Sequence, residues 1–248
     1  MNENYKNISI NLNFKPSSAF LIGLMVNFID FLLWNRTQIP FTVDMLEKFL
    51  QKKNLDDIKC FKKLKAVKIA KDAYERICGV KELTKLEFTT SKSFIILFGS
   101  SIQTAKEAYK IIFPSTNSNV TPTFINETSN IKKVFLQLLQ SDDLKDALES
   151  PLTVTNTFVL YERRCRNDEK ISTNLFEVRN FKLNKSCKKF LINFTDSSNF
   201  EVFQEDFEEL KISEHEVVVE KVEEIWFQSK IFVKGFSDLT TDNKSIWG

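Results

Sequence analysis

Glycine and histidine are scarce in this sequence, and their scarcity excludes several classes of site. The 248-residue chain has 5 glycines, at positions 23, 79, 99, 235 and 248. Walker loops and GxGxxG turns need closely spaced glycines, because there the backbone must approach a phosphate. The sequence therefore excludes nucleotide-binding sites of these two classes. The single histidine, His215, lies among glutamates and valines, so it is a weak candidate for a metal ligand or a catalytic base.

Paired cysteines and a strong net charge are also missing. The 4 cysteines form no CxxC pair and are interpreted as reduced thiols. A formal net charge of +2 gives no global argument for a nucleic-acid or membrane partner, and we expect neither. No HExxH, GxSxG or EF-hand pattern occurs. We therefore expect a protein that is not an enzyme, with no catalytic residues, no metal site and no cofactor. Catalysis by carboxylates alone stays an open alternative.

The longest hydrophobic run, from Ala19 to Trp34, is too short to predict a transmembrane helix. A membrane span needs about 20 predominantly apolar residues, and this run is interrupted by Asn27 and Asp30. We expect a core helix instead, with the Asp30 carboxylate satisfied by a neighbouring group. The first six residues contain no apolar signal-peptide core, so we expect the protein to lie inside the cell.

The remaining patterns predict one α+β domain over residues 1–238 and a flexible tail over residues 239–248. With 42% hydrophobic residues, the chain can bury a sizeable core. Apolar runs and period-two alternation predict strands at 8–14, 93–99, 152–161, 175–183, 188–194, 217–222 and 224–236. Capping residues and helical periodicity predict helices at 19–34, 42–53, 56–79, 104–113, 130–139 and 141–149.

Charge is unevenly distributed along the chain even though it nearly cancels. Lysines crowd residues 52–71, and residues 201–224 are strongly acidic. We interpret the lysines as the solvated face of a helix, because the aromatic residues of a nucleic-acid footprint are not interleaved with them. The acidic stretch is interpreted as surface, with electrostatic steering of a basic partner as the functional alternative.

The most informative segment covers residues 224–236. Its alternation predicts a strand with Phe227 on one face and Trp226 on the other, so both faces need cover. The run Trp-Phe-Gln followed by Phe-Val-Lys-Gly-Phe resembles the closing segment of the comet family, whose members bind the Mad-two spindle-checkpoint protein. Further blocks resemble the same family in the same order, at residues 35–41, 95–109, 131–144 and 150–159.

The resemblance implies a HORMA-like fold, in which a mixed β-sheet packs on three main helices and a C-terminal segment wraps like a safety belt. It implies a non-enzymatic adaptor that binds the closed conformer of the Mad-two checkpoint protein and presents it to an AAA+ remodelling ATPase. The adaptor would promote disassembly of the mitotic checkpoint complex and silence the spindle checkpoint. It would be a monomer alone and a heterodimer with its partner. It would act in the nucleus and cytoplasm, and at the spindle or kinetochore during division.

The resemblance also implies which residues contact the partner. In the predicted helix at 130–139, Ile131, Val134 and Leu138 form the inward stripe. Phe135 would be interpreted as a packing residue by itself, whereas the resemblance matches it to the aromatic that relatives insert into their partner. The implied interface residues are Phe135, Lys132, Lys133, Leu136, Leu139, Asn35 and Arg36.

Two further sites follow from the resemblance. The ATPase contact corresponds to Val178 and Arg179, both of which differ from the family residues. The C-terminal segment is implied to fold back on its own domain through the aromatic residues Trp226, Phe227, Phe232 and Phe236. Relatives have glutamine where this chain has Asn35, which is a departure from the family pattern.

Two alternatives to this interpretation stay open. The first is a different HORMA-class scaffold, for instance of autophagy or DNA repair, which would share the fold and bind another partner. The second is a small carboxylate-dependent enzyme on an α+β fold, which would need an enclosed polar pocket with perturbed acids.

Overall fold

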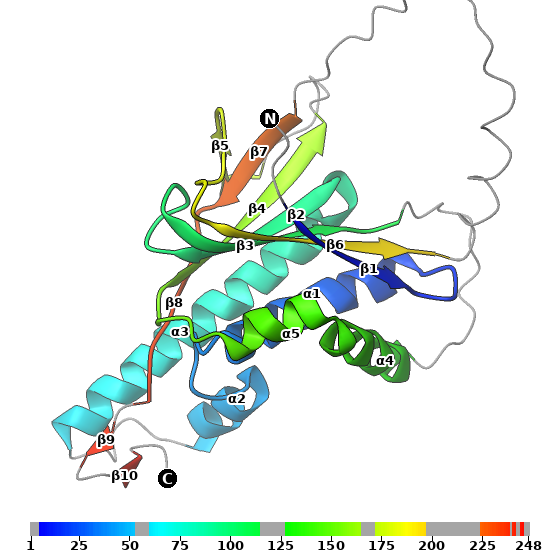
Figure 1. Ribbon diagram of the computed structural model, residues 1–248. Helices are drawn as coiled ribbons and strands as arrows, with labels where there is room; N and C mark the ends of the chain where they lie inside the picture. Colours follow the sequence, from blue (N-terminus) through cyan, green and yellow to red (C-terminus); the bar gives the residue numbers. More distant parts are fainter. Residues whose placement is uncertain are drawn as a thin grey trace, which may run out of the picture.

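The computed structural model describes residues 5–52, 60–114, 127–164, 172–196 and 224–238, with two short strands at 240–241 and 244–245 (Figure 1). The described helices are α1 (Ser18–Asn35), α2 (Val43–Lys52), α3 (Phe61–Glu87), the 3₁₀ turn η2 (Phe88–Thr90), α4 (Glu127–Gln140) and α5 (Asp142–Glu149). The described strands are β1 (Lys6–Asn11), β2 (Ser93–Gly99), β3 (Ala105–Ile112), β4 (Asn156–Arg164), β5 (Leu175–Val178), β6 (Lys188–Thr195), β7 (Glu224–Ser229), β8 (Val233–Lys234), β9 (Thr240–Thr241) and β10 (Lys244–Ser245).

The main sheet is mixed. Its strand order in the described chain is β1-β6-β3-β2-β4-β7-β5, with β8 also paired to β4. Strands β1, β6 and β3 run parallel to one another, and the other pairs are antiparallel. Strand β2 lies in the middle, and each of its residues is buried, as its continuous apolar run predicts. The α+β class expected from the sequence is therefore confirmed.

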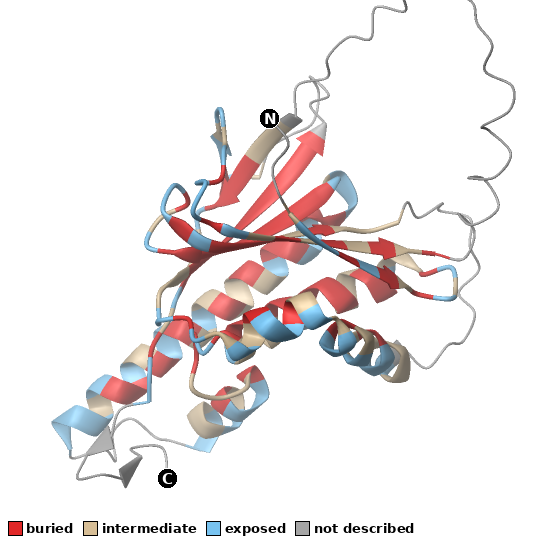
Figure 2. Cartoon of the chain, viewed as in Figure 1, coloured by how far each residue is buried: buried red, intermediate tan, exposed pale blue. Residues whose placement is uncertain are grey.

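Both faces of the sheet are covered. Helices α1 and α3 lie along one face, with α4 and α5 beside them near β1 (Figure 1). The buried residues follow the sheet and the helix sides that face it (Figure 2). Alternate residues of β2 divide between two apolar clusters: Phe94 and Ile96 pack toward the helices, whereas Ile95 and Leu97 pack on the other face. The sheet therefore organises both cores.

Helix α1 is a core helix, as its sequence predicts. It is long and apolar enough to cross a membrane by length and composition, but Leu21, Leu24, Met25 and Leu32 are fully buried in the protein core. The Ser17 hydroxyl caps it by accepting a hydrogen bond from the Phe20 amide at 3.0 Å. Most of the apolar surface of α1 is therefore buried within the domain.

Two local predictions are wrong. The segment predicted as a helix at 104–113 is strand β3, which pairs with β2 and β6 on either side. These long-range hydrogen bonds override the local helix propensity of its Ala-Lys-Glu-Ala run. Gly79 was expected to end a helix, but α3 continues to Glu87. A Cβ at Gly79 would lie 3.0 Å from the Ile231 side chain, so this glycine admits the C-terminal segment instead.

Other predicted features differ in their bounds or lie outside the described residues. Strand β4 begins at Asn156, later than the predicted start at residue 152. Strand β5 ends at Val178, earlier than the predicted end at residue 183. In the tail, β9 and β10 pair antiparallel, which the sequence pattern does not predict. Four predicted features lie outside the described residues: the acidic stretch up to residue 223, the valine-rich strand at 217–222, His215 and residues 53–59 of the lysine-rich stretch.

We expect Gly235→Ala to destabilise the domain, because a Cβ there would lie 2.6 Å from the Thr155 carbonyl oxygen and 3.0 Å from Gln38 Oε1. The backbone would have to shift, at a cost of about 1–3 kcal/mol in the free energy of unfolding. Urea denaturation followed by circular dichroism measures this cost. Ser237→Ala is the matched control, because Ser237 is an exposed residue of the same segment. Equal stability of the two variants would contradict the close approach.

Candidate interaction site

Helix α4 presents an apolar ridge to solvent. Val134 and Leu138 are buried, and Ile131 packs toward Gly23 of α1, so the predicted inward stripe is confirmed. Leu136 is 60% exposed and Leu139 is 43% exposed. Large aliphatic side chains are usually buried, so two exposed leucines three residues apart on one helix form a small unpartnered apolar surface. We call Leu136 and Leu139 the α4 ridge.

Phe135 connects this ridge to α1. It is half-buried, and its ring lies 5.0 Å from the Phe31 ring and 6.2 Å from the Phe28 ring between centroids. These separations suit favourable aromatic pairs. Phe135 therefore serves the core with one side and borders the surface with the other. Replacing it would remove both contacts, so the more exposed Leu136 is the sharper probe of the surface.

A hollow of about 240 Å³ lies next to Phe135, between α1, α2 and α4. Phe31 and Trp34 of α1 line it, and Trp34 is 50% exposed. Two carboxylates, Asp30 and Asp44, also line it. We call this hollow the α1–α2 pocket. Sequence reasoning missed Trp34, because it was counted with the core face of α1. The signal was the pair of polar residues Asn27 and Asp30, which lie about two turns and one turn before Trp34 on the same side of α1.

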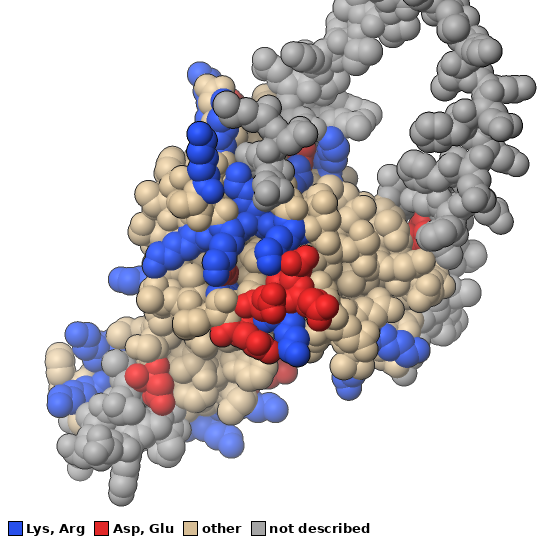
Figure 3. Space-filling view, viewed as in Figure 1, with Lys and Arg blue, Asp and Glu red and all other residues tan. Residues whose placement is uncertain are grey.

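Charge around this surface is mixed. Lys132 and Lys133 of α4 are exposed, so their side chains are accessible to a partner. Elsewhere on the molecule, lysine and arginine side chains gather over the sheet, next to acidic side chains (Figure 3). Lys6 of β1 and Asp143 of α5 form an exposed ion pair at 2.9 Å. Exposed pairs of this kind contribute little to stability.

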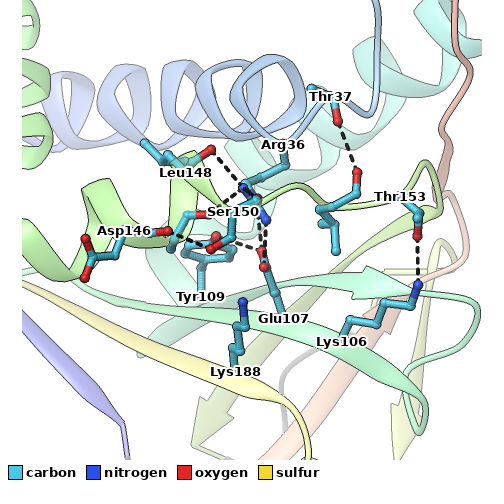
Figure 4. Close-up of polar contacts among 12 residues, drawn as sticks. Arg36, Thr37, Lys106, Glu107, Tyr109, Asp146, Leu148, Ser150, Thr153 and Lys188 are labelled. Carbon is cyan, nitrogen blue, oxygen red and sulfur yellow. Dashed lines mark hydrogen bonds and ion pairs between the residues drawn. The ribbon is translucent and has the colours of Figure 1, made fainter.

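Arg36 does not lie at the surface, which corrects its assignment as a partner contact. Its side chain is 1% exposed and forms a bidentate ion pair with Glu107 of β3, at 2.8 Å from Nε and 2.7 Å from Nη2 (Figure 4). Nη1 donates to the Ala147 carbonyl at 2.7 Å and to the Ser150 carbonyl at 2.9 Å. Arg36 therefore holds the end of α5 against β3, and its guanidinium is unavailable to a partner.

Tyr109 completes this buried network. Its hydroxyl donates to Glu107 Oε2 at 3.0 Å (Figure 4). Burial raises the pKa of the Tyr109 phenol, and the Glu107 carboxylate acts in the same direction. The phenol is therefore a stable donor. Asn35, next to Arg36, is half-buried, and its side-chain amide donates to the Phe31 carbonyl at 2.8 Å within α1. Asn35 thus lies beside the α1–α2 pocket but is engaged by its own helix.

Gln38 fixes the C-terminal segment. Its carbonyl accepts a hydrogen bond from the Phe236 amide at 2.8 Å, and its side-chain oxygen accepts one from the Thr155 amide at 2.7 Å. The Gly235 amide donates to the Thr155 carbonyl at 3.0 Å. The block at 35–41 is therefore a structural clamp that joins α1 to the end of the chain.

The C-terminal segment lies on its own domain. Strand β7 pairs with β4 and β5, and β8 pairs with β4. Phe227 and Phe236 are buried in the helix-side cluster, whereas Trp226 and Phe232 pack on the opposite face of the sheet. Strict alternation over residues 224–236 predicts Phe236 on the same face as Trp226, but Phe236 packs on the opposite face, because the chain leaves the sheet after β8.

The predicted ATPase contact lies at the end of β5. Arg179 is exposed, and its Nε donates to Glu177 Oε1 at 3.1 Å. Val178 is half-buried and packs against the second apolar cluster. The two residues therefore differ in kind: the Arg179 side chain is accessible to a partner, whereas Val178 also supports the fold.

Lastly, the chain can be compared with known sites and known proteins. Within the described residues, no group of three or more His, Cys, Asp or Glu side chains is arranged to hold a metal ion. No protein-family model matches the sequence, and a search of curated proteins gives no significant match. These comparisons therefore assign no role to the α4 ridge or the α1–α2 pocket.

Proposed function

We propose that this protein is a HORMA-like adaptor of the comet type, which binds the closed conformer of the Mad-two checkpoint protein. One observation carries the proposal: the α4 ridge is exposed, on a domain whose own C-terminal segment is already docked. Exposed apolar surface with a polar rim is typical of a protein–protein interface, and Lys132 and Lys133 provide polar groups beside the α4 ridge. The ordered blocks of family resemblance, which end in Trp226-Phe227-Gln228, supply the identity of the partner.

The docked C-terminal segment favours a binder over a peptide trap. Strands β7 and β8 pair with β4 along one side, so the C-terminal segment already occupies the place where a ligand strand would pair with β4. A ligand peptide that adds a strand needs a free edge. We therefore place the partner on the side chains of the helical layer. The α4 ridge is one of the apolar surfaces that this layer leaves exposed.

The adaptor would act by conformer selection. If the α4 ridge fits only the closed form of the checkpoint protein, the adaptor binds that form better than the open form. It would then deliver the closed form to an AAA+ ATPase, whose hydrolysis of ATP drives the conversion to the open form. This sequence of events would disassemble the mitotic checkpoint complex. The adaptor supplies selectivity, and the ATPase supplies the energy.

We expect Arg179→Glu to abolish recruitment of the ATPase while leaving binding of the checkpoint protein unchanged. The charge is reversed at an exposed side chain that follows β5, whereas α4 lies near β1 at the opposite edge of the sheet (Figure 1), so its effect should be confined to one partner. Lys182→Glu, at another exposed position of the same connection, is the control. Size-exclusion chromatography of the ternary mixture reads both interactions. Intact recruitment by Arg179→Glu would remove this residue from the proposed contact.

The principal competing proposal is a HORMA-class scaffold with another partner, and a capture experiment separates the two. The immobilised protein is offered the closed checkpoint protein and, separately, HORMA proteins of autophagy and DNA repair. We expect retention of the checkpoint protein only. Retention of another HORMA protein in its place would reassign the function while keeping the fold proposal.

A further inference from the structure

The α1–α2 pocket has the size and chemistry to receive one side chain. Its volume of about 240 Å³ is smaller than the roughly 300–1,000 Å³ of small-molecule sites. Two carboxylates and three aromatic rings line it, those of Phe31, Trp34 and Phe135. Among the described residues, its lining contains no lysine or arginine. A pocket of this kind favours a cation with an apolar stem.

The carboxylate of Asp30 is only half satisfied. Its Oδ2 accepts a hydrogen bond from Lys81 of α3 at 2.6 Å, whereas its Oδ1 is buried and accepts none within the described protein. Buried polar atoms are normally paired, so an orphaned carboxylate oxygen needs a physical explanation. Burial raises the pKa of the Asp30 carboxyl against the opposing effect of Lys81, and Asp44 adds to the rise. A second cation would relieve this cost.

Asp44 alone would not make a site. It lies in the first turn of α2, where a carboxylate is favoured by the helix dipole without any ligand. The exposed Trp34 ring supplies the independent feature, because an indole face attracts a cation more strongly than other aromatic rings do. The combination of carboxylates with an accessible indole is therefore what distinguishes this pocket from an acidic surface patch.

We infer that the α1–α2 pocket binds an arginine side chain of the partner, with the guanidinium between the two carboxylates and against Trp34. Arginine fits better than lysine, because its planar group can bond two carboxylates and also stack on a ring. This inference rests on the proposed function, since the pocket is lined by Phe135, which directly precedes Leu136 of the α4 ridge on the same helix. The partner would thus be gripped by an apolar ridge and an ionic pocket side by side.

A probe that needs no partner tests the pocket itself. N-acetyl-arginine amide is titrated into the full-length, ¹⁵N-labelled protein, and the Trp34 indole N–H resonance is followed. N-acetyl-citrulline amide is the matched neutral probe, and the Trp226 indole is the internal control. We expect the arginine probe to shift Trp34 at least fivefold more than the citrulline probe, and Asp44→Asn to reduce that shift. Equal shifts by both probes, or no shift by arginine, would overturn the inference.

A second experiment tests the pocket in the complex with the partner. In a calorimetric titration with the closed checkpoint protein, we expect Asp44→Asn to raise the Kd about tenfold and to flatten its dependence on salt. If the wild type binds and Leu136→Asp does not, while Asp44→Asn and Trp34→Ala bind like the wild type, the pocket inference fails and the proposed function stands. If the wild type does not bind, the proposed function fails, and the arginine probe still decides the chemistry of the pocket.

Discussion

Replacing Leu136 by aspartate is expected to weaken binding of the closed checkpoint protein by at least 100-fold and to leave the domain folded. Leu136 is 60% exposed, so the new carboxylate remains hydrated in the free protein. In the complex it would be buried in an apolar contact without a partner. A loss of this size corresponds to about 3 kcal/mol, which is within the range of interface hot spots. Isothermal titration calorimetry measures the Kd, and circular dichroism checks the fold.

Leu86→Asp is the matched control for this prediction. Leu86 is also a leucine on an exposed helix position, 73% accessible, but it belongs to α3. We expect its replacement to change neither the Kd nor the free energy of unfolding. If both variants bind with the wild-type Kd, the α4 ridge is not the interface. If both lose binding, the effect of aspartate is a general one.

Arg36→Met is expected to destabilise the domain by about 3–5 kcal/mol. The substitution leaves the Glu107 carboxylate buried, at 2% exposure, without its guanidinium, and an uncompensated buried charge has a cost of this size. The carbonyls of Ala147 and Ser150 lose their donor as well. Chemical denaturation in urea gives the change in the free energy of unfolding. A loss below about 1 kcal/mol would contradict the central role of this ion pair.

The double variant Arg36→Met with Glu107→Met separates charge burial from lost hydrogen bonds. Replacing both members of a buried ion pair by apolar side chains is often close to neutral. We expect the double variant to regain part of the stability that Arg36→Met loses. Full recovery would mean that the bonds to the α5 carbonyls contribute nothing. If the double variant regains no stability, the loss in Arg36→Met comes entirely from the hydrogen bonds to these carbonyls, and the unpaired Glu107 carboxylate contributes nothing to it.

Local sequence patterns predict those features of the fold that depend on residues close to one another in the sequence. The apolar run of β2 and the helical wheel of α4 are both of this kind, and the structure bears out each of them. The wheel also places Leu136 beyond the inward stripe of α4 and Leu139 at the edge of that stripe. Half of the candidate surface is therefore readable from a single helix.

Contacts between segments that are distant in the sequence explain the features that the sequence patterns did not predict. Strand β3 is a strand because β2 and β6 flank it, and its own residues favour a helix. Arg36 looks like a surface residue at a helix end, yet its partner Glu107 is 71 positions away. Trp34 lies in the most hydrophobic run of the chain but borders a pocket formed with α2 and α4. Such features arise only when distant segments meet.

The most direct measurement is a pair of calorimetric titrations of this protein with the Mad-two checkpoint protein, held separately in its closed and open conformers. We expect the closed conformer to bind at least 100-fold more tightly than the open one, and Leu136→Asp to abolish this binding. Equal affinity for the two conformers would contradict selection of the closed form. Absence of binding to either conformer would contradict the proposed function as a whole.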